Sequence, residues 1–496
     1  MTHTRRLATI ARTGVLAAMI GFGTATAQDA PENAYLADST WPLFHKNGYA
    51  QAAGDFDAVG AGDALTFQRR DNPDGGTAPW TVFPTPYADG RQAVISNTQY
   101  GVIKWLIDGE RLDRVGYVEL PRGRFDFDWN VAVLKGGDIV VTSIRENRFY
   151  ILGDTSPGCA ECDLTVRRAI DVPKPVGEIT IHFSIAYDGH ILVLMEDSKI
   201  AAISPVTGEV KAVGSLGQGG SGYSYHNAFV SDETGRVFIT SQKGVTALDW
   251  TGREFRPAWE ALYDFRGPGC REPRRQSRLR ERLRTIRGKR CTGTGTTPTL
   301  MGSPRDGLVV MVDGHAPANH LVAFWRGEPP ADWLGHPGRD RRFAGRIPLP
   351  LSTPEGEGHT AENSPAVLGN AVFVAQWAGF NPDCSPPKGV QRVDWNPEER
   401  RFDLVWANPH VHFNGIPTAS SRSRLVYGTG RGEGCTYAYR GLDIDTGQLR
   451  LDLPLGEDDA FTDQGNQQAV ADDGSIVVGV RKGTLRISRQ ETSGAD

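Results

Sequence analysis

Residues 182–216 read HFSIAYDGHILVLMEDSKIAAISPVTGEVKAVGSL, and this stretch decides the fold. It divides into four short runs, HFSIAYD, HILVLME, KIAAISP and EVKAVGSL, with turn-forming pairs between them: Asp188-Gly189, Asp197-Ser198 and Thr207-Gly208. The runs are rich in apolar and small residues without a helical period, so they predict strands rather than helices. A meander of four strands cannot bury both of its faces alone, and it therefore requires similar units on either side.

Such units follow one another along nearly the whole chain. Seven of them have four strand-like runs each, at 85–120, 128–172, 182–216, 226–262, 296–349, 362–408 and 415–456. An eighth unit, at 466–490, has only three runs, and the isolated run DALTFQRRD at 63–71 is suited to complete it. The pattern predicts an all-β protein, a single eight-bladed β-propeller closed by this N-terminal strand, with seven blades as the alternative. A series of β-sandwiches would leave the regular spacing without a cause.

The first residues predict export. Arg5 and Arg6 precede an apolar run at 13–24 and the A-x-A sequence at 25–27, which is the pattern of a secretory signal peptide over residues 1–27. Removal of residues 1–27 takes away three arginines and no acids, so the net charge changes from −5 to −8. We expect an acidic, periplasmic or secreted monomer without a membrane anchor and without nucleic-acid affinity. An extended arm at 28–62 precedes the propeller at 63–491.

Six cysteines in an exported chain favour disulfides. Proximity in the sequence predicts three pairs: Cys159–Cys162, Cys270–Cys291 and Cys384–Cys435. The second pair brackets a basic stretch, REPRRQSRLRERLRTIRGKR at 271–290, inside a long insertion at 264–294 between the fourth and fifth blades. Ten Lys/Arg against two Glu give this stretch a net charge of +8.

Apolar spacing within the basic stretch predicts a short amphipathic helix, with Leu279, Leu283 and Ile286 on one face. We expect its arginines to select a negatively charged substrate at the adjacent face of the ring, with three of them exposed to the cleft: Arg278, Arg282 and Arg284. A solvated surface decoration is the alternative.

Three hairpins share one pattern, in which an apolar strand runs into a polar residue, then Thr-Gly, then the outer strand. They are AAISPVTGEVKA from Ala201, TALDWTGREFRPAW from Thr246 and GLDIDTGQLRLDL from Gly441. This pattern resembles the repeat of the quinoprotein-like (PQQ-type) β-propeller superfamily, and WPLFHKNG from Trp41 resembles the Trp-containing N-terminal segment of those proteins. The resemblance implies a propeller fold and suggests an oxidoreductase, in which PQQ with a divalent metal is one cofactor to consider.

The sequence departs from that superfamily's alcohol dehydrogenases in two ways. It has no two adjacent cysteines, and Cys159-x-x-Cys162 is followed by Asp163 rather than by the His of a c-type haem motif. The cofactor therefore stays unknown. No nucleophile elbow and no Walker loop occurs either.

In a propeller the first strand of each blade lines the axis, and the leading residues of these strands converge around one mouth of the channel. Candidate catalytic residues there are His182, His226 and Glu362. Candidate substrate-binding residues are Asp128, Asn130, Asn363 and Gln467, together with the three arginines of the insertion. Histidine and carboxylate side chains suit acid–base chemistry or a metal site, and the metal is left open. The alternative is that these polar residues only hold the water that fills a propeller channel.

The sequence thus predicts an exported propeller enzyme that acts on a small, anionic molecule at the axial mouth, with oxidoreductase as the first assignment. A lyase or hydrolase of an anionic saccharide is the second interpretation. A non-enzymatic periplasmic scaffold or binding propeller is the third.

Overall fold

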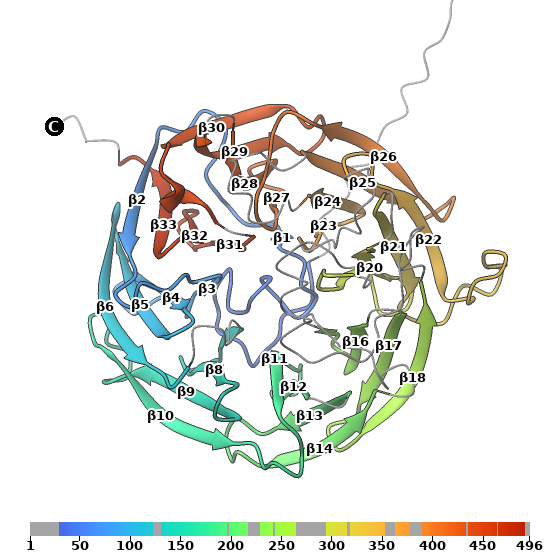
Figure 1. Cartoon of the computed structure of the whole chain (residues 1–496), viewed down its shortest axis with the longest axis horizontal. Coiled ribbons are helices and arrows are strands. Elements are labelled where there is room, and N and C mark those ends of the chain that lie inside the picture. Colours follow the sequence, from blue (N-terminus) through green and yellow to red (C-terminus); the bar gives the residue numbers. More distant parts are fainter. Residues whose placement is uncertain are drawn as a thin grey trace, which may run out of the picture.

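The computed structural model describes residues 29–122, 130–195, 198–216, 229–241, 244–263, 294–314, 318–352, 363–376, 389–432, 435–463 and 465–491. Eight sheets follow one another around a central axis, and the strands of each sheet are arranged in order from the axis to the periphery (Figure 1). The all-β, eight-bladed propeller predicted from the repeats is therefore confirmed. Among the described residues, no helix is long and apolar enough to cross a membrane.

The first four blades are four-stranded antiparallel meanders. Blade 1 has β3 (Trp80–Val82), β4 (Gln92–Asn97), β5 (Gly101–Asp108) and β6 (Arg111–Glu119). Blade 2 has β7 (Val131–Val133), β8 (Ile139–Ser143), β9 (Arg148–Asp154) and β10 (Leu164–Asp171). Blade 3 has β11 (Ile179–Ile185), β12 (Ile191–Met195), β13 (Lys199–Ile203) and β14 (Val210–Ser215). Blade 4 has β15 (Val230–Ser231), β16 (Arg236–Thr240), β17 (Gly244–Trp250) and β18 (Phe255–Leu262).

The other four blades continue the ring. Blade 5 has β19 (Thr299–Met301), β20 (Leu308–Val312), β21 (His320–Trp325) and β22 (Phe343–Pro348). Blade 6 has β23 (Ala366–Leu368), β24 (Ala371–Ala375), β25 (Val390–Asn396) and β26 (Arg401–Asn408). Blade 7 has β27 (Thr418–Ser420), β28 (Leu425–Arg431), β29 (Tyr437–Asp443) and β30 (Leu449–Gly456), with β1 (Ala53–Gly54) added inside β27. Blade 8 has β31 (Gln468–Val470), β32 (Ile476–Val480), β33 (Gly483–Arg489) and β2 (Leu65–Asp71), and a 3-10 turn, η3 (Asp459–Phe461), precedes it.

The predicted closure of the ring is confirmed. Strand β2 pairs antiparallel with β33 from Leu65 opposite Arg489 to Asp71 opposite Gly483, so an N-terminal strand becomes the outer strand of blade 8. Closure in this way leaves blade 8 no half-finished edge to pair with other chains.

The expectation that blade 1 begins with a strand at residues 85–90, TPYADG, is wrong. Residues 85–91 form a turn, in which the Tyr87 amide donates to Arg91 O, and the inner strand is β3, which pairs with β4. The β-branched and aromatic residues of β3 suit a strand, whereas Pro84 and Pro86 lack the amide hydrogen that a strand ladder needs.

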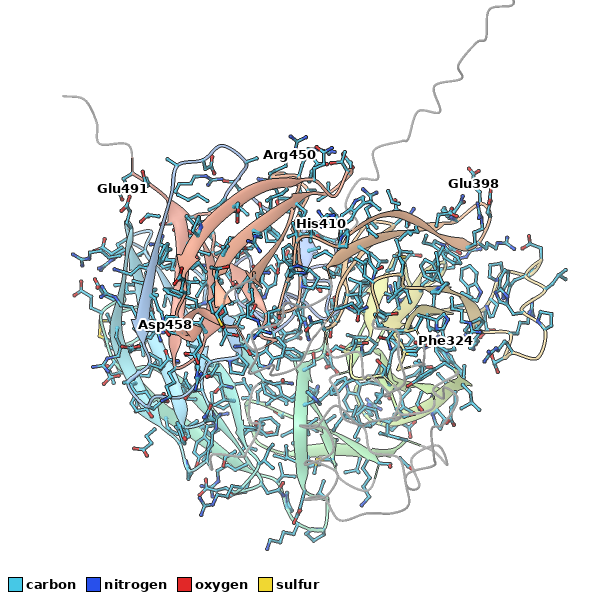
Figure 2. All side chains as sticks on the ribbon, turned by 45° about the horizontal axis from the view of Figure 1, so that its top comes forward. Phe324, Glu398, His410, Arg450, Asp458 and Glu491 are labelled. Atoms are coloured by element: carbon cyan, nitrogen blue, oxygen red, sulfur yellow. A yellow bond between two sulfur atoms is a disulfide. The ribbon has the colours of Figure 1, made fainter. Side chains whose placement is uncertain are left out.

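Buried apolar side chains fill the space between neighbouring blades. Exposed residues such as Glu398 and Arg450 lie at the periphery of the molecule (Figure 2). Successive residues of a strand point to opposite faces of the sheet, and both faces are buried against neighbouring blades. The four-stranded unit therefore needs a neighbour on each side.

The N-terminal arm lies inside the ring, and this could not be read from its sequence. Figure 1 shows it as the blue trace near the axis. Residues between 33 and 59 hydrogen-bond to the first strand, or to the turn directly after it, in every blade. The backbone contacts include Phe83 N to Trp41 O, Val133 N to Pro42 O, Ser231 N to Gly48 O, Leu300 N to Tyr49 O, Val367 N to Gln51 O, Ala419 N to Ala52 O and Val59 N to Gly474 O, and Asn33 Nδ2 donates to Ile185 O in blade 3.

Four arm residues other than glycine have a left-handed backbone, namely His45, Lys46, Ala50 and Ala52, with φ between 49° and 79°. Such residues are rare, and surrounding structure must compensate for their strain. The arm turns repeatedly because its hydrogen-bond partners lie on blades all around the axis.

Candidate functional site

The two faces of the ring carry different connections between strands. In a four-stranded meander, the start of the first strand and the connection from the second to the third strand lie on one face, which we call the mouth face. Turns from the first to the second strand lie on the opposite face, and the arm contacts several of them, as Val59 N does with Gly474 O. The arm therefore occupies the axis from the far side, and its His45 reaches toward the mouth face.

Polar side chains at the mouth face link blades 1, 2 and 3. Asn97 Nδ2 donates to Asn130 O at 3.0 Å, and Asn130 Nδ2 donates to Phe183 O at 3.2 Å. Asn130 Nδ2 also lies 3.5 Å from Nδ1 of His182, whose side chain is only partly buried. Two of the predicted site residues, Asn130 and His182, are thus brought together.

His45 lies at the centre and connects blades 5 and 8. Its backbone amide donates to Gln467 Oε1 at 2.6 Å, and its Nε2 lies 3.2 Å from Thr297 Oγ1. The Thr297 amide in turn donates to Ser364 Oγ of blade 6 at 2.9 Å. His45 and Gln467 are 1% and 2% exposed, so this is the floor of the mouth.

Blades 6, 7 and 8 complete the ring of contacts. Asn363 Nδ2 donates to Gly415 O at 3.1 Å, and Asn414 Nδ2 donates to Asp463 Oδ1 at 2.9 Å. Asn363, Asn414 and Asp463 are all buried. The corresponding first-strand lead of blade 4, at 217–228, lies outside the described residues. Seven blades therefore contribute polar groups to the described part of a floor around His45.

Burial sets the protonation states on this floor. Burial, with a smaller contribution from the nearby His182, lowers the pKa of His45 to about 3, so His45 is neutral at physiological pH. Burial raises the pKa of Asp463 to about 7, while hydrogen bonds from Asn414 and from the Gly465 amide act in the opposite direction. The floor therefore carries one carboxyl group that exchanges its proton near neutral pH.

Four buried polar atoms on the floor have no hydrogen-bond partner among the described residues: His45 Nδ1, Gln467 Nε2, Asn414 Oδ1 and Asp463 Oδ2. Buried polar atoms are normally hydrogen-bonded, so such a group of unpaired donors and acceptors requires water or a ligand. A mixed donor and acceptor set suits a polar small molecule.

A hollow with a volume of about 360 Å³ lies between blades 1 and 8 toward the far face. Its arginines are already paired: Arg486 donates to Gly109 O and Asp473, and Arg489 donates to Asp57 and Asp63. None of the residues lining this hollow has a buried polar side-chain atom without a partner. The axial floor is therefore the better candidate site.

Several predicted site residues remain untested. His226, Glu362, Asp128 and the three arginines of the insertion lie outside the described residues, as does the helix predicted there. Asn363 and Gln467 lie on the floor, as described above. His45 and Asp463 were missed by the sequence reasoning. His45 belongs to the WPLFHKNG segment, which was noted only for its resemblance to the N-terminal segment of the quinoprotein-like propellers. Asp463 lies four residues before Gln467, the residue of blade 8 that was predicted at the mouth.

The disulfide prediction is confirmed for one pair. Cys159 and Cys162 form a disulfide with a Cα–Cα distance of 5.3 Å. Cys435 is disulfide-bonded, and its predicted partner Cys384 lies outside the described residues, as do Cys270 and Cys291.

Comparisons with known proteins support the fold. No protein-family model matches the chain. An uncharacterized protein of Archaeoglobus fulgidus is 26% identical over 483 residues, which cover 93% of this chain and 89% of that protein. The quinohemoprotein alcohol dehydrogenase of Comamonas testosteroni has a similar structure, with a TM-score of 0.51, 12% identity and coverage of 93% of this chain and 83% of that one. A europium-containing methanol dehydrogenase aligns with a TM-score of 0.52 and 10% identity over 90% of this chain and 98% of that one. At these identities the likeness shows the fold alone.

Proposed function

We propose that this protein is an exported enzyme that binds a small, anionic molecule at the axial mouth of its propeller and acts on it there. One observation carries the proposal: seven blades and the arm contribute polar groups to a floor around His45, and four of its buried donor and acceptor atoms have no partner in the part of the chain that the structure describes. A propeller that used its axis only for packing would not need buried donors and acceptors without partners, because each costs free energy.

Acid–base chemistry is the reaction type that suits these side chains. A general acid or base works best with a pKa near the operating pH, and the pKa of Asp463 is about 7. His182 is partly exposed and lies beside Asn130, so it can reach a molecule in the mouth. Neutral His45 supplies a hydrogen bond without adding a charge to the floor.

The preference for an anion rests on the insertion between blades 4 and 5. Its basic stretch at 271–290 carries a net charge of +8. The insertion follows β18 and precedes β19 in the chain. A connection from a fourth strand to the next first strand belongs to the mouth face. The arginines there would attract carboxylate, sulfate or phosphate groups.

Oxidoreductase is the reaction class we propose first, because the chain resembles the quinoprotein-like propellers and two dehydrogenases have similar folds. The residues at the axial floor do not match those that hold the quinone cofactor in the quinoprotein-like alcohol dehydrogenases. The sequence has no two adjacent cysteines, and the described part of the site offers amides, the imidazoles of His45 and His182, and the carboxyl group of Asp463. We therefore assign no step to a quinone.

A binding screen tests the proposal directly. Protein purified from the periplasm would be exposed to small carboxylates, sugar acids and phosphates and to uncharged analogues, with binding followed by ligand-observed NMR. We expect an anionic ligand to bind, and we expect His182→Ala to weaken binding or turnover at least tenfold, which corresponds to about 1.4 kcal/mol. The matched control is His410→Ala, because His410 is exposed and lies outside the floor. Equal effects of the two variants would rule out the axial site.

Salt dependence tests the charge preference separately. Neutralising Arg278, Arg282 and Arg284 together should weaken binding of the anion and flatten its dependence on ionic strength, while uncharged analogues stay unaffected. An absorption spectrum and metal analysis of the same protein test the oxidoreductase assignment. A quinone band or stoichiometric metal favours redox chemistry, and their absence from active protein favours the lyase or hydrolase.

A further inference from the structure

The Cys159–Cys162 disulfide lies in the hairpin between β9 and β10 of blade 2. Its two cysteines are partly exposed, and Ser156, Pro157 and Gly158 before them are exposed. The hairpin joins a third to a fourth strand, so it belongs to the face opposite the axial mouth. The axial site therefore does not explain its chemistry.

A buried ammonium group lies directly beneath this turn. Lys104 of β5, whose side chain is 0% exposed, donates from Nζ to Cys159 O at 3.1 Å, to Cys162 O at 3.0 Å and to Asp154 Oδ1 at 2.7 Å. The Tyr87 hydroxyl donates to the other oxygen of Asp154 at 2.9 Å, and Lys104 Nζ lies 5.0 Å from the centre of the Tyr87 ring. One positive charge is thus bonded to the backbone of both cysteines.

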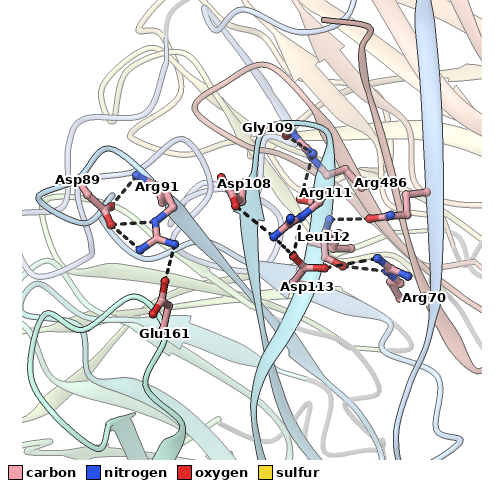
Figure 3. A network of polar contacts seen from close by, with 11 residues as sticks. Arg70, Asp89, Arg91, Asp108, Gly109, Arg111, Leu112, Asp113, Glu161 and Arg486 are labelled. Atoms are coloured by element: carbon pink, nitrogen blue, oxygen red, sulfur yellow. Dashed lines mark hydrogen bonds and ion pairs between the residues drawn. The ribbon is translucent and has the colours of Figure 1, made fainter.

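The turn is held in place without its disulfide. The Cys162 amide donates to Cys159 O at 3.3 Å, and the Thr155 amide donates to Asp163 O at 2.8 Å. Asp163 Oδ1 accepts from the Tyr117 amide of blade 1 at 2.9 Å. Glu161 is bonded to Arg91 of blade 1 at 3.0 Å, and Figure 3 shows Arg91 between Asp89 and Glu161.

A disulfide between residues only 3 positions apart also restricts the unfolded chain very little, because that effect grows with the length of the closed loop. The turn therefore gains little stability from the S–S bond, and its backbone can keep the same conformation when the bond is broken. Two thiols held in this way remain next to each other.

We propose that Cys159 and Cys162 form a reversible dithiol–disulfide site that exchanges electrons with an external dithiol. A thiolate of the dithiol attacks one sulfur, the S–S bond breaks, and the other cysteine leaves as a thiolate. The second thiol of the external molecule then attacks its own sulfur in the mixed disulfide. The external molecule leaves as a cyclic disulfide, and the remaining cysteine is released as a thiol. Two electrons and two protons pass from the external dithiol to Cys159 and Cys162.

Lys104 is the positioning residue of this site. A nearby cation lowers the pKa of a thiol and stabilises the thiolate, which is both the leaving group on reduction and the nucleophile on reoxidation. The ammonium bonds to both cysteine carbonyls, so its charge lies beneath the turn, and it is shared with the Asp154 carboxylate at 2.7 Å. We expect the ammonium to favour the thiolate on either cysteine in spite of this carboxylate.

Redox titration of the full-length protein tests the proposal, with mixtures of reduced and oxidised dithiothreitol as the probe. The fraction of Cys159–Cys162 that is reduced is measured by acid quenching, alkylation and peptide mass. We expect the same fraction from the oxidised and the reduced side, with circular dichroism unchanged. We expect Lys104→Met to shift the equilibrium at least threefold toward the disulfide, and Lys104→Arg to shift it less. Lys211→Met, on β14, is the control.

The thiol pKa gives a second measurement that needs no variant. In the reduced wild-type protein, the pH dependence of alkylation should give one thiol a pKa at least one unit below the ordinary value of about 8.5. An ordinary pKa, reduction that occurs only with unfolding, or an unchanged equilibrium in folded Lys104→Met would each overturn the proposal. These results do not depend on ligand binding at the axial mouth, which lies on the other face.

Discussion

At the scale of single residues, burial decides the charge on the axial floor. His45 and Asp463 both lose water on folding, and both are therefore held in their neutral form over part of the physiological range. The consequences for stability have opposite signs. The low pKa of His45 costs stability as the pH falls below about 6.5, since only the unfolded chain then gains the proton.

Asp463 gives a pH prediction of the other sign. Its folded-state pKa of about 7 lies above the ordinary value of 3.8, so the unfolded chain loses this proton first as the pH rises. The contribution of Asp463 to stability is complete below about pH 4 and decreases through pH 7, by on the order of a few kcal/mol. Thermal denaturation of Asp463→Asn should show a gain over the wild type at pH 8 that decreases as the pH falls and disappears below about pH 4. The exposed Asp306→Asn should show no such trend, and a gain that is independent of pH would contradict the assignment.

At the scale of elements, the junction of blades 8 and 1 depends on a glycine. Gly479 of β32 faces the segment before β3 so closely that a Cβ there would lie 1.6 Å from Ala78 O. No side chain fits without moving one backbone away from the other. Gly479→Ala should therefore destabilise the protein by about 3 kcal/mol, measured by urea denaturation. Gly60→Ala is the control, because its added Cβ would meet nothing closer than Asp63 at 3.5 Å.

The cysteines give a prediction at the same scale. Peptide mapping without reduction should show Cys270–Cys291 and Cys384–Cys435 in addition to Cys159–Cys162. Cys435 is disulfide-bonded in the structure, and Cys384 is its expected partner. A mapped bond between Cys435 and any cysteine other than Cys384 would show that proximity in the sequence misassigns the pairs.

At the scale of the whole molecule, the N-terminal segment holds the ring together twice. The arm hydrogen-bonds to all eight blades, and β2 completes blade 8. Deletion of residues 28–72 should therefore give aggregated or unfolded protein, because it exposes the edge of β33 and opens the axis. Size-exclusion chromatography and circular dichroism measure this outcome. A soluble truncated protein of equal stability would show that the ring closes without its N-terminus.

The sequence by itself determined most of the strands, favoured eight blades over seven, and identified the closing strand. These features follow from local patterns, namely apolar strands of regular spacing and turns such as Thr207-Gly208, where Gly208 has a φ of 74°. An unfinished blade and a spare strand also identify each other in the sequence. The pairing of Cys159 with Cys162 was predictable because the two residues are near neighbours.

Only the tertiary structure decided how the arm fills the axis and which side chains form the floor. The arm has no period because its partners come from eight different blades, so no regular spacing is imposed on it. For the same reason Asn130 and Asn363 were predicted from their strand positions, while His45 was not. The pKa values of His45 and Asp463 follow from burial by segments far apart in the sequence, and that burial exists only once the ring has closed.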